Sequence, residues 1–278
     1  MPELPEVEVV RRGLEAHVVG RRVRRVEVGR ERTVRRTSRE AVITGLTGTT
    51  ITAVGRRGKY LVCSLDSGDA VLIHLRMSGQ LRLGPTGAPC PPHTHVAMEL
   101  DGGEELWFVD PRTFGEVVVF DPDRAAHEVP ELGRLGPDPV VDGLSVGELR
   151  ARLRGRSRPI KSLLLDQHAV AGLGNIYSDE VLHRAGVRFD HPAGEVVPRR
   201  VGLLRHAIVE VLDEAIAAGG STLADSQYLG LSGQPGSYQH QHRVYGREGL
   251  SCPRCGRAAI VRARHAGRST FFCPRCQR

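Results

Sequence analysis

The chain opens with Met1-Pro2-Glu3-Leu4-Pro5-Glu6-Val7-Glu8, and this stretch predicts the helix that begins the fold. Proline is tolerated in the first turn of a helix, because the N–H group that it lacks would have no helical partner there. Val7, Val10 and Leu14 follow at helical spacing, and Gly20 marks the end of the helix.

The same stretch contains a candidate catalytic pair. If Met1 is removed, the chain starts with the secondary amine of Pro2. An α-amine titrates near ~8 and a lysine amine near ~10.4, so the α-amine is the better nucleophile at pH 7. It can form an iminium with a sugar carbon, and Glu3 beside it is a candidate general acid. Chains that begin Met-Pro are common, however, so this stretch alone does not establish a site.

Composition indicates a soluble, globular protein. The 278 residues suffice for one large domain or two ordinary ones, with 40% apolar and 26% charged residues. No apolar run approaches the ~20 residues of a membrane span, and no secretory signal is visible. We therefore expect a cytoplasmic, nucleoid-associated protein with no membrane partner.

The positive charge is concentrated at the C-terminal end. Residues 243–278 hold nine arginines and one acid, Glu248, a formal charge of +8, whereas the whole chain carries +7. A local field of this kind attracts phosphate backbones. The segment therefore suggests a nucleic-acid partner.

Four cysteines in this basic segment predict a metal site. Cys252, Cys255, Cys273 and Cys276 have the spacing C-x2-C-x17-C-x2-C, which places four thiolates in a tetrahedron suited to one structural Zn²⁺. Disulfides are the less favoured alternative, because no secretory signal is present. The other two cysteines have no partner at ligand spacing.

The remaining sequence predicts an α+β fold. Eight short apolar segments between residues 21 and 120, separated by Gly- and Asp-rich turns, indicate a β-sandwich or barrel. Helical patterns follow at 145–154, 159–168, 174–184 and 198–218. We expect four parts: a β domain at 1–125, a linker at 126–144, a helical domain at 145–242 and a zinc finger at 243–278.

Only two lysines stand among the 39 basic residues, Lys59 and Lys161. Arginine is always charged, whereas lysine can exchange its proton and act in acid–base chemistry. The two lysines are therefore candidate functional residues, although chance also leaves a few lysines in an arginine-rich chain.

With these pieces in view, the chain resembles the bacterial formamidopyrimidine-DNA glycosylase family over its whole length. The similarity is carried by the N-terminal stretch and by ordered blocks further on, which are Gly-Arg-Arg-Gly-Lys-Tyr-Leu at 55–61, His-Leu-Arg-Met-Ser-Gly-Gln-Leu at 74–81, Asp-Pro-Arg-Thr-Phe-Gly at 110–115, Ile-Lys at 160–161, Gly-Leu-Gly-Asn-Ile-Tyr at 172–177, Val-Tyr-Gly-Arg at 244–247 and Gly-Arg-Ser-Thr-Phe-Phe-Cys at 267–273. The resemblance implies an N-terminal β-sandwich flanked by helices, and a helical domain with a helix–two-turn–helix and a zinc-finger hairpin.

The resemblance also implies catalytic roles. Pro2 would form a Schiff base with the damaged nucleotide and Glu3 would protonate the sugar oxygen. Lys59 would assist β-elimination and Arg268 δ-elimination. A guanidinium is a poor proton donor, so for Arg268 we favour phosphate binding.

Residues that bind double-stranded DNA follow from the same resemblance. Met77, Arg112 and Phe114 would fill the space left by the flipped nucleotide. Phosphates near the lesion would be contacted by His74, His93, Arg156, Lys161 and Asn175. The loop at 219–242 would close over the flipped base.

These features together predict a monomeric, bifunctional glycosylase and AP lyase of base-excision repair, with one structural zinc. Its substrates would be oxidised purines, 8-oxoguanine and formamidopyrimidines. One alternative is an endonuclease VIII-like glycosylase for oxidised pyrimidines, which Leu4-Pro5 disfavours, because that family typically begins Pro-Glu-Gly-Asp. Another is a non-catalytic protein that only binds damaged DNA.

Overall fold

The computed structural model describes residues 1–223 and 228–278, and these form two compact units. The first unit comprises Met1–Arg134 and Ala218–Ser237. The second comprises Leu135–Ala217 and Tyr238–Arg278. In the part of the chain that the structure describes, no helix has both the length and the hydropathy to cross a bilayer.

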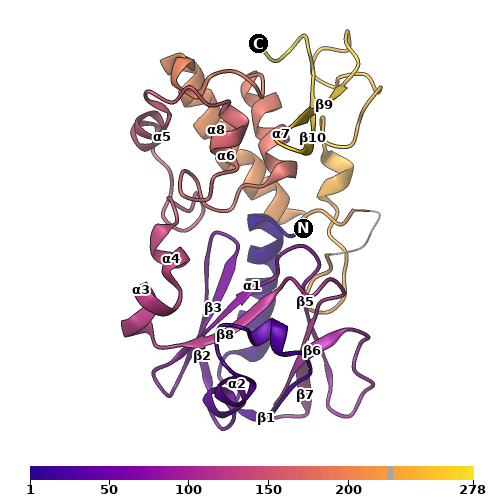
Figure 1. The fold of residues 1–278 in the computed structure, drawn as a ribbon. Coiled ribbons are helices and arrows are strands. Elements are labelled where there is room, and N and C mark those ends of the chain that lie inside the picture. The colour runs from indigo at the N-terminus through magenta and orange to yellow at the C-terminus, as the bar shows by residue number, and fades with distance from the viewer. Residues whose placement is uncertain (224–227) are drawn as a thin grey trace. The chain divides into compact units, whose positions relative to one another are not determined.

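Two antiparallel four-stranded sheets form the first unit (Figure 1). One has the order β1-β6-β7-β5 and the other the order β2-β3-β4-β8. The strands are β1 (Val23–Val28), β2 (Ile51–Arg57), β3 (Tyr60–Leu65), β4 (Ala70–His74), β5 (Gln80–Pro85), β6 (Thr94–Leu100), β7 (Glu104–Val109) and β8 (Glu116–Phe120). All eight expected strands are present, and the predicted β-sandwich is confirmed.

Side chains from both sheets share one apolar core with helix α1 (Leu4–Val18). Val7, Val10 and Leu14 of α1 are each at most 1% exposed, as their helical spacing predicted. Burying each such side chain contributes about 1.5–3 kcal/mol. In β1, a bulge lets both Val23 and Val26 point into the core despite their odd spacing.

Several short helices were not predicted. The 3-10 helix η1 (Glu31–Val34) and helix α2 (Arg39–Leu46) lie between β1 and β2. The expected linker contains α3 (Ala125–Glu128) and α4 (Pro130–Arg134), preceded by the 3-10 helix η2 (Pro122–Arg124). Val129, between α3 and α4, is fully buried against the outer face of β4 and β8, so this segment packs on the sheet.

The second unit is helical, as expected, and ends in a two-stranded hairpin. Its elements are α5 (Val146–Leu153), α6 (Ile160–Leu164), α7 (Asn175–Ala185), the 3-10 helix η3 (Ala193–Glu195), α8 (Pro198–Ala217), the 3-10 helix η4 (Tyr238–Gln241), β9 (Val261–His265) and β10 (Arg268–Phe272). Helix α6 is shorter than predicted. Asp166 accepts the backbone N–H of His168 at 3.0 Å, and this local turn replaces further helix.

Candidate active site

The N-terminal end of α1 is buried, and a carboxylate fixes its backbone. Pro2 and Glu3 are both buried. The backbone N–H of Glu3 donates to Glu6 Oε2 at 2.8 Å, which caps the helix. The other oxygen of Glu6 accepts the N–H of Ser221 at 2.8 Å. Glu6 therefore holds the residue after Pro2 and one end of the 219–242 loop at once.

The described residues of this loop up to Ser237 pack on the first unit. Tyr228 and Leu231 belong to its core, and Leu231 O accepts the N–H of Leu83 at 3.1 Å. These contacts explain why residues 218–237 cluster with the first unit, whereas the sequence placed them in the helical domain. The middle of the predicted loop, residues 224–227, lies outside the described residues.

Lys59 lies in the tight turn between β2 and β3, and a buried ion pair fixes that turn. Lys59 is only 7% exposed. Arg56 donates from Nε to Glu8 Oε2 and from Nη1 to the carbonyl of Gly58, both at 2.9 Å. Burial alone would raise the pKa of Glu8. Hydrogen bonds from arginines, Arg56 included, lower the pKa by more than burial raises it, so the net shift is downward. The turn that carries Lys59 is thereby tied to α1.

His74, the last residue of β4, is held as a neutral ring. Its Nδ1 accepts the backbone N–H of Arg76 at 2.9 Å, so the proton lies on Nε2. Burial, followed by the nearby charges of Arg76 and Lys59, brings the pKa of His74 well below its usual value. His74 can therefore donate a hydrogen bond without carrying charge.

The three residues expected to fill a gap in DNA lie on turns of the first unit. Met77 and Phe114 are each 38% exposed. Arg112 is exposed, and its guanidinium lies 5.1 Å from the centre of the Phe114 ring. The sequence correctly predicted that Met77 and Phe114 are not core residues.

Asp110 holds both of these turns, and sequence reasoning missed it. This fully buried carboxylate accepts the hydroxyl of Ser78 at 2.5 Å, the N–H of Gly115 at 2.7 Å and the N–H of Arg112 at 3.3 Å. Its own N–H donates to the carbonyl of exposed His93 at 3.0 Å. Asp110 therefore joins the Met77 turn, the Phe114 turn and His93.

Glycine is required beside Asp110. A Cβ atom at Gly115 would lie 2.4 Å from Phe108 Cζ, which no side chain could occupy. Thr113, two residues before it, has φ of 56°, in the left-handed region. The tight turn between them directs Phe114 outward.

A second buried carboxylate, Glu116, gathers arginines close to His74. Glu116 accepts from Arg35, from Arg36 Nη2 at 2.8 Å and from Arg76 Nη2 at 3.2 Å. Three guanidiniums around one carboxylate leave local positive charge, which suits a phosphate-binding surface. Only the Arg76 block was singled out in the sequence.

In the second unit, the structure places Lys161 differently from expectation. Lys161 is 0% exposed, and its Nζ lies 2.7 Å from both Asp179 Oδ1 and Thr270 Oγ1. The other oxygen of Asp179 accepts the N–H of Phe271 at 3.0 Å. An ammonium enclosed in this way holds β10 against α7 and is not placed to contact a phosphate.

The other expected contacts in this unit lie nearer the surface. Asn175, at the start of α7, donates from Nδ2 to the carbonyl of Ser269 at 2.9 Å. Arg268 and Arg156 are exposed. The hairpin that carries Arg268 is therefore attached to α7 through its own backbone.

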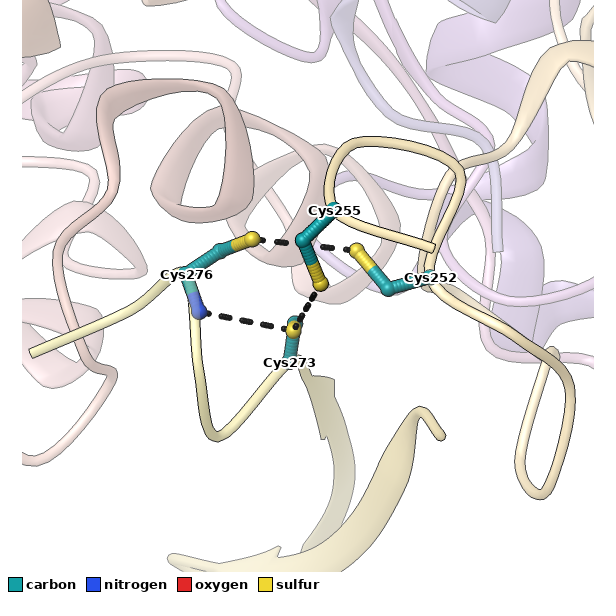
Figure 2. Close-up of side chains that lie close together, drawn as sticks. All are labelled: Cys252, Cys255, Cys273 and Cys276. Carbon is teal, nitrogen blue, oxygen red and sulfur yellow. Dashed lines mark hydrogen bonds between the residues drawn. The ribbon is translucent and has the colours of Figure 1, made fainter. Parts of the chain in front are cut away.

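The four cysteine sulfurs form the predicted metal site (Figure 2). All four sulfurs lie within 4.8 Å of one another, and Cys252–Cys276 and Cys255–Cys273 are each separated by 3.8 Å. A tetrahedron with Zn–S bonds of about 2.3 Å has edges of about 3.8 Å, whereas a disulfide needs about 2.05 Å. The cluster fits a structural zinc, with no open position for catalysis.

Comparison with known families divides the chain into three matched regions. Residues 1–117 match the formamidopyrimidine-DNA glycosylase N-terminal domain, and residues 135–227 match the H2TH domain of the same family. Residues 249–278 match a zinc finger found in FPG and IleRS.

Individual relatives match over their full length. The formamidopyrimidine-DNA glycosylase of Stenotrophomonas maltophilia is 44% identical, with all of both chains covered. That of Desulforamulus reducens is 41% identical over all of this chain and 99% of the relative. Among solved structures, the Lactococcus lactis Fpg in complex with DNA containing an abasic site is 38% identical, with a TM-score of 0.91 over 99% of both chains. The MutM (FPG) protein of Thermus thermophilus is 42% identical, with a TM-score of 0.89 over 99% of this chain and 98% of that one.

Proposed function

The chain belongs to the formamidopyrimidine-DNA glycosylase family, and we propose that it is a bifunctional enzyme that excises oxidised purines from duplex DNA and cleaves the resulting abasic site. The burial of Pro2 and Glu3, with the backbone N–H of Glu3 held by Glu6, is the observation that carries this proposal. A nucleophilic amine gains most when its neighbouring acid and the backbone between them are already oriented.

In the proposed reaction, the amine of Pro2, freed by removal of Met1, attacks C1′ of a nucleotide flipped out of the duplex. The bond from C1′ to the base breaks, and the base leaves with the proton that the attacking amine gives up. Glu3 then protonates the ring oxygen O4′ as the C1′–O4′ bond breaks, and the nitrogen lone pair completes the iminium. The resulting iminium acidifies the C2′ proton. Loss of that proton expels the 3′-phosphate, with Lys59 as the proton donor, and water then releases the sugar from Pro2.

Duplex binding in this proposal is divided between two groups of residues. Met77, Phe114 and Arg112 enter the stack where the nucleotide has left. Phosphates are bound by the buried, neutral ring of His74 and by the exposed or half-buried residues His93, Arg156, Asn175 and Arg268. Lys161 contributes by holding β10 in place. The nonspecific part of this binding is electrostatic and therefore salt-dependent.

The mechanism is tested by borohydride trapping on a duplex that contains 8-oxoguanine. We expect a covalent adduct, and an intact mass that shows Pro2 as the first residue. In Pro2→Gln, the long side chain at position 2 prevents removal of Met1, so this variant should give no adduct. Pro5→Ala should give the adduct normally. An active protein that retains Met1 would overturn the Pro2 mechanism. Specific binding without any adduct would instead indicate a damage-binding protein.

Substrate class and assembly need separate measurements. Excision of 8-oxoguanine should exceed excision of thymine glycol in matched duplexes, and the reverse order would indicate the endonuclease VIII-like alternative. We also propose that the protein acts as a monomer in the bacterial cytoplasm. A mass near 30.3 kDa by light scattering would support the monomer.

A further inference from the structure

One buried histidine beside the zinc site has no part in the proposed reaction. His183, on α7, is 0% exposed, and its Nε2 lies 3.3 Å from the Sγ of Cys252. Cys252 is itself 0% exposed. Water therefore cannot reach this sulfur, and any hydrogen bond to it must come from the protein.

The surroundings of the ring determine which nitrogen carries the proton. His183 Nδ1 is buried, and it has no hydrogen-bond partner within the described residues. A proton on Nδ1 would be buried and unpaired, whereas a lone pair there is less costly to bury. The favoured tautomer carries its proton on Nε2, the nitrogen that faces Cys252.

The sulfur is a suitable acceptor when the metal is bound. Four thiolates and one Zn²⁺ carry a formal charge of −2, which N–H donors offset. Buried Cys273 receives the N–H of Cys276 at 3.4 Å. We propose that the Nε2–H group of His183 donates a hydrogen bond to the zinc-bound thiolate of Cys252. This hydrogen bond stabilises the zinc site and joins it to α7.

Among the described residues, the other contacts of the knuckles with α7 and with Val187 just after it involve backbone carbonyls. Arg254 donates to the carbonyl of His183 at 2.9 Å and to that of Arg184 at 3.2 Å. Gln277 donates to the carbonyl of Val187 at 3.0 Å. These contacts dock the finger, and they provide a matched control in which docking changes while the sulfur keeps its donor.

Three variants separate the hydrogen bond from packing. His183→Phe keeps a ring but removes the donor, His183→Gln places an amide N–H at a similar reach, and Arg254→Met removes only contacts with carbonyls. Zinc release from the purified protein into a colorimetric chelator should be about 10–100-fold faster in His183→Phe, the usual effect of losing an outer-shell partner of a metal ligand. His183→Gln should stay within about threefold of wild type, since it restores the donor.

A spectroscopic measurement reports on the sulfur itself. In the Co²⁺-substituted protein, removing an N–H donor raises the energy of the thiolate electrons. The thiolate-to-cobalt charge-transfer band should therefore move to lower energy in His183→Phe. It should not move in Arg254→Met, which leaves the sulfur untouched.

Wild-type protein provides a test that does not depend on a folded variant. In the ¹¹³Cd-substituted protein, a scalar coupling should link the Hε2 proton of His183 with the metal through the hydrogen bond. Absence of that coupling, or equal zinc release by His183→Phe and wild type, would overturn the proposal. Equally fast release by the Phe and Gln variants would assign the effect to packing and overturn it as well. None of these measurements involves Pro2 or DNA.

Discussion

Arg56 and Glu8 form a buried ion pair, with 2.9 Å between Arg56 Nε and Glu8 Oε2, that joins the β2–β3 turn to the helix that begins beside Pro2. The same guanidinium holds the carbonyl of Gly58, one residue before Lys59. The proposed nucleophile and the proposed acid of the elimination step thus belong to one braced structure.

Arg56→Met should slow strand cleavage at a preformed abasic site by at least about tenfold, because a displacement of about 1 Å can cost 10²-fold in rate. Glu8 keeps Arg11 and Arg12 as partners, so no charge is left unpaired and the loss of stability should be about 1–3 kcal/mol. Single-turnover kinetics and thermal unfolding measure the two effects.

Arg11→Met is the control for this prediction, because it removes a different guanidinium from Glu8 and no contact with Gly58. Cleavage should be little changed. Equal cleavage rates for Arg56→Met and Arg11→Met would argue against a role of the Arg56–Glu8 ion pair in positioning Lys59.

The same ion pair makes stability depend on pH. The pKa of Glu8 is lowered in the folded state, so the contribution of Glu8 to stability is present above its ordinary pKa of 4.5 and is lost as pH falls through the folded pKa.

His74 should make stability depend on pH. Its folded-state pKa lies well below 6.5, so as pH falls below about 6.5 only the unfolded chain takes up this proton, and the free energy of unfolding decreases. His74→Asn, which can still accept the N–H of Arg76, should show a smaller decrease between pH 7 and pH 5 in urea titrations. Identical pH dependence in both proteins would mean that the ring takes up its proton equally well in the folded and unfolded chains, which would contradict a lowered pKa.

Asp110→Asn should weaken binding to DNA with an abasic-site analogue by about tenfold or more. The amide cannot accept all three hydrogen bonds, and an unpaired buried polar group costs about 1–3 kcal/mol. Fluorescence of 2-aminopurine beside the lesion would report the loss of insertion by Met77 and Phe114. Asp121→Asn, at a surface turn, is the matched control and should behave as wild type.

Lys161→Met should weaken DNA binding without changing its salt dependence. The ammonium is enclosed by Asp179 and Thr270, so its loss loosens β10 but releases no counterion from DNA. Arg268→Gln should instead reduce the slope of log K against log salt by about 0.9, as expected for one lost phosphate contact. A similar reduction in Lys161→Met would show that this lysine reaches DNA directly.

The strands of the first unit and the zinc cluster could be predicted because their signals are local. Apolar segments alternate with Gly-rich turns, and ligand spacing is visible within 25 residues of sequence. The helix of residues 39–46 and those of residues 125–134 were missed because four to eight residues are too few to show a helical period.

The network around the candidate site could not be predicted, because its partners are far apart in the sequence. Glu6 reaches Ser221 across 215 positions and Asp110 reaches Ser78 across 32. Lys161 was expected to contact a phosphate near the lesion, because the family resemblance implies that role. Only the fold showed that Asp179 neutralises it.

Asn175, Asp179 and His183 are spaced four apart on α7, and each contacts a different part of the C-terminal finger. Since each helical residue turns by about 100°, inserting a single alanine between Asn175 and His183 would rotate these two residues to different faces of the helix, and at least one of the three attachments would be lost. A foreign zinc finger grafted onto this enzyme would need its own partner helix, because the spacing of Asn175, Asp179 and His183 along α7 matches the contact points of this finger.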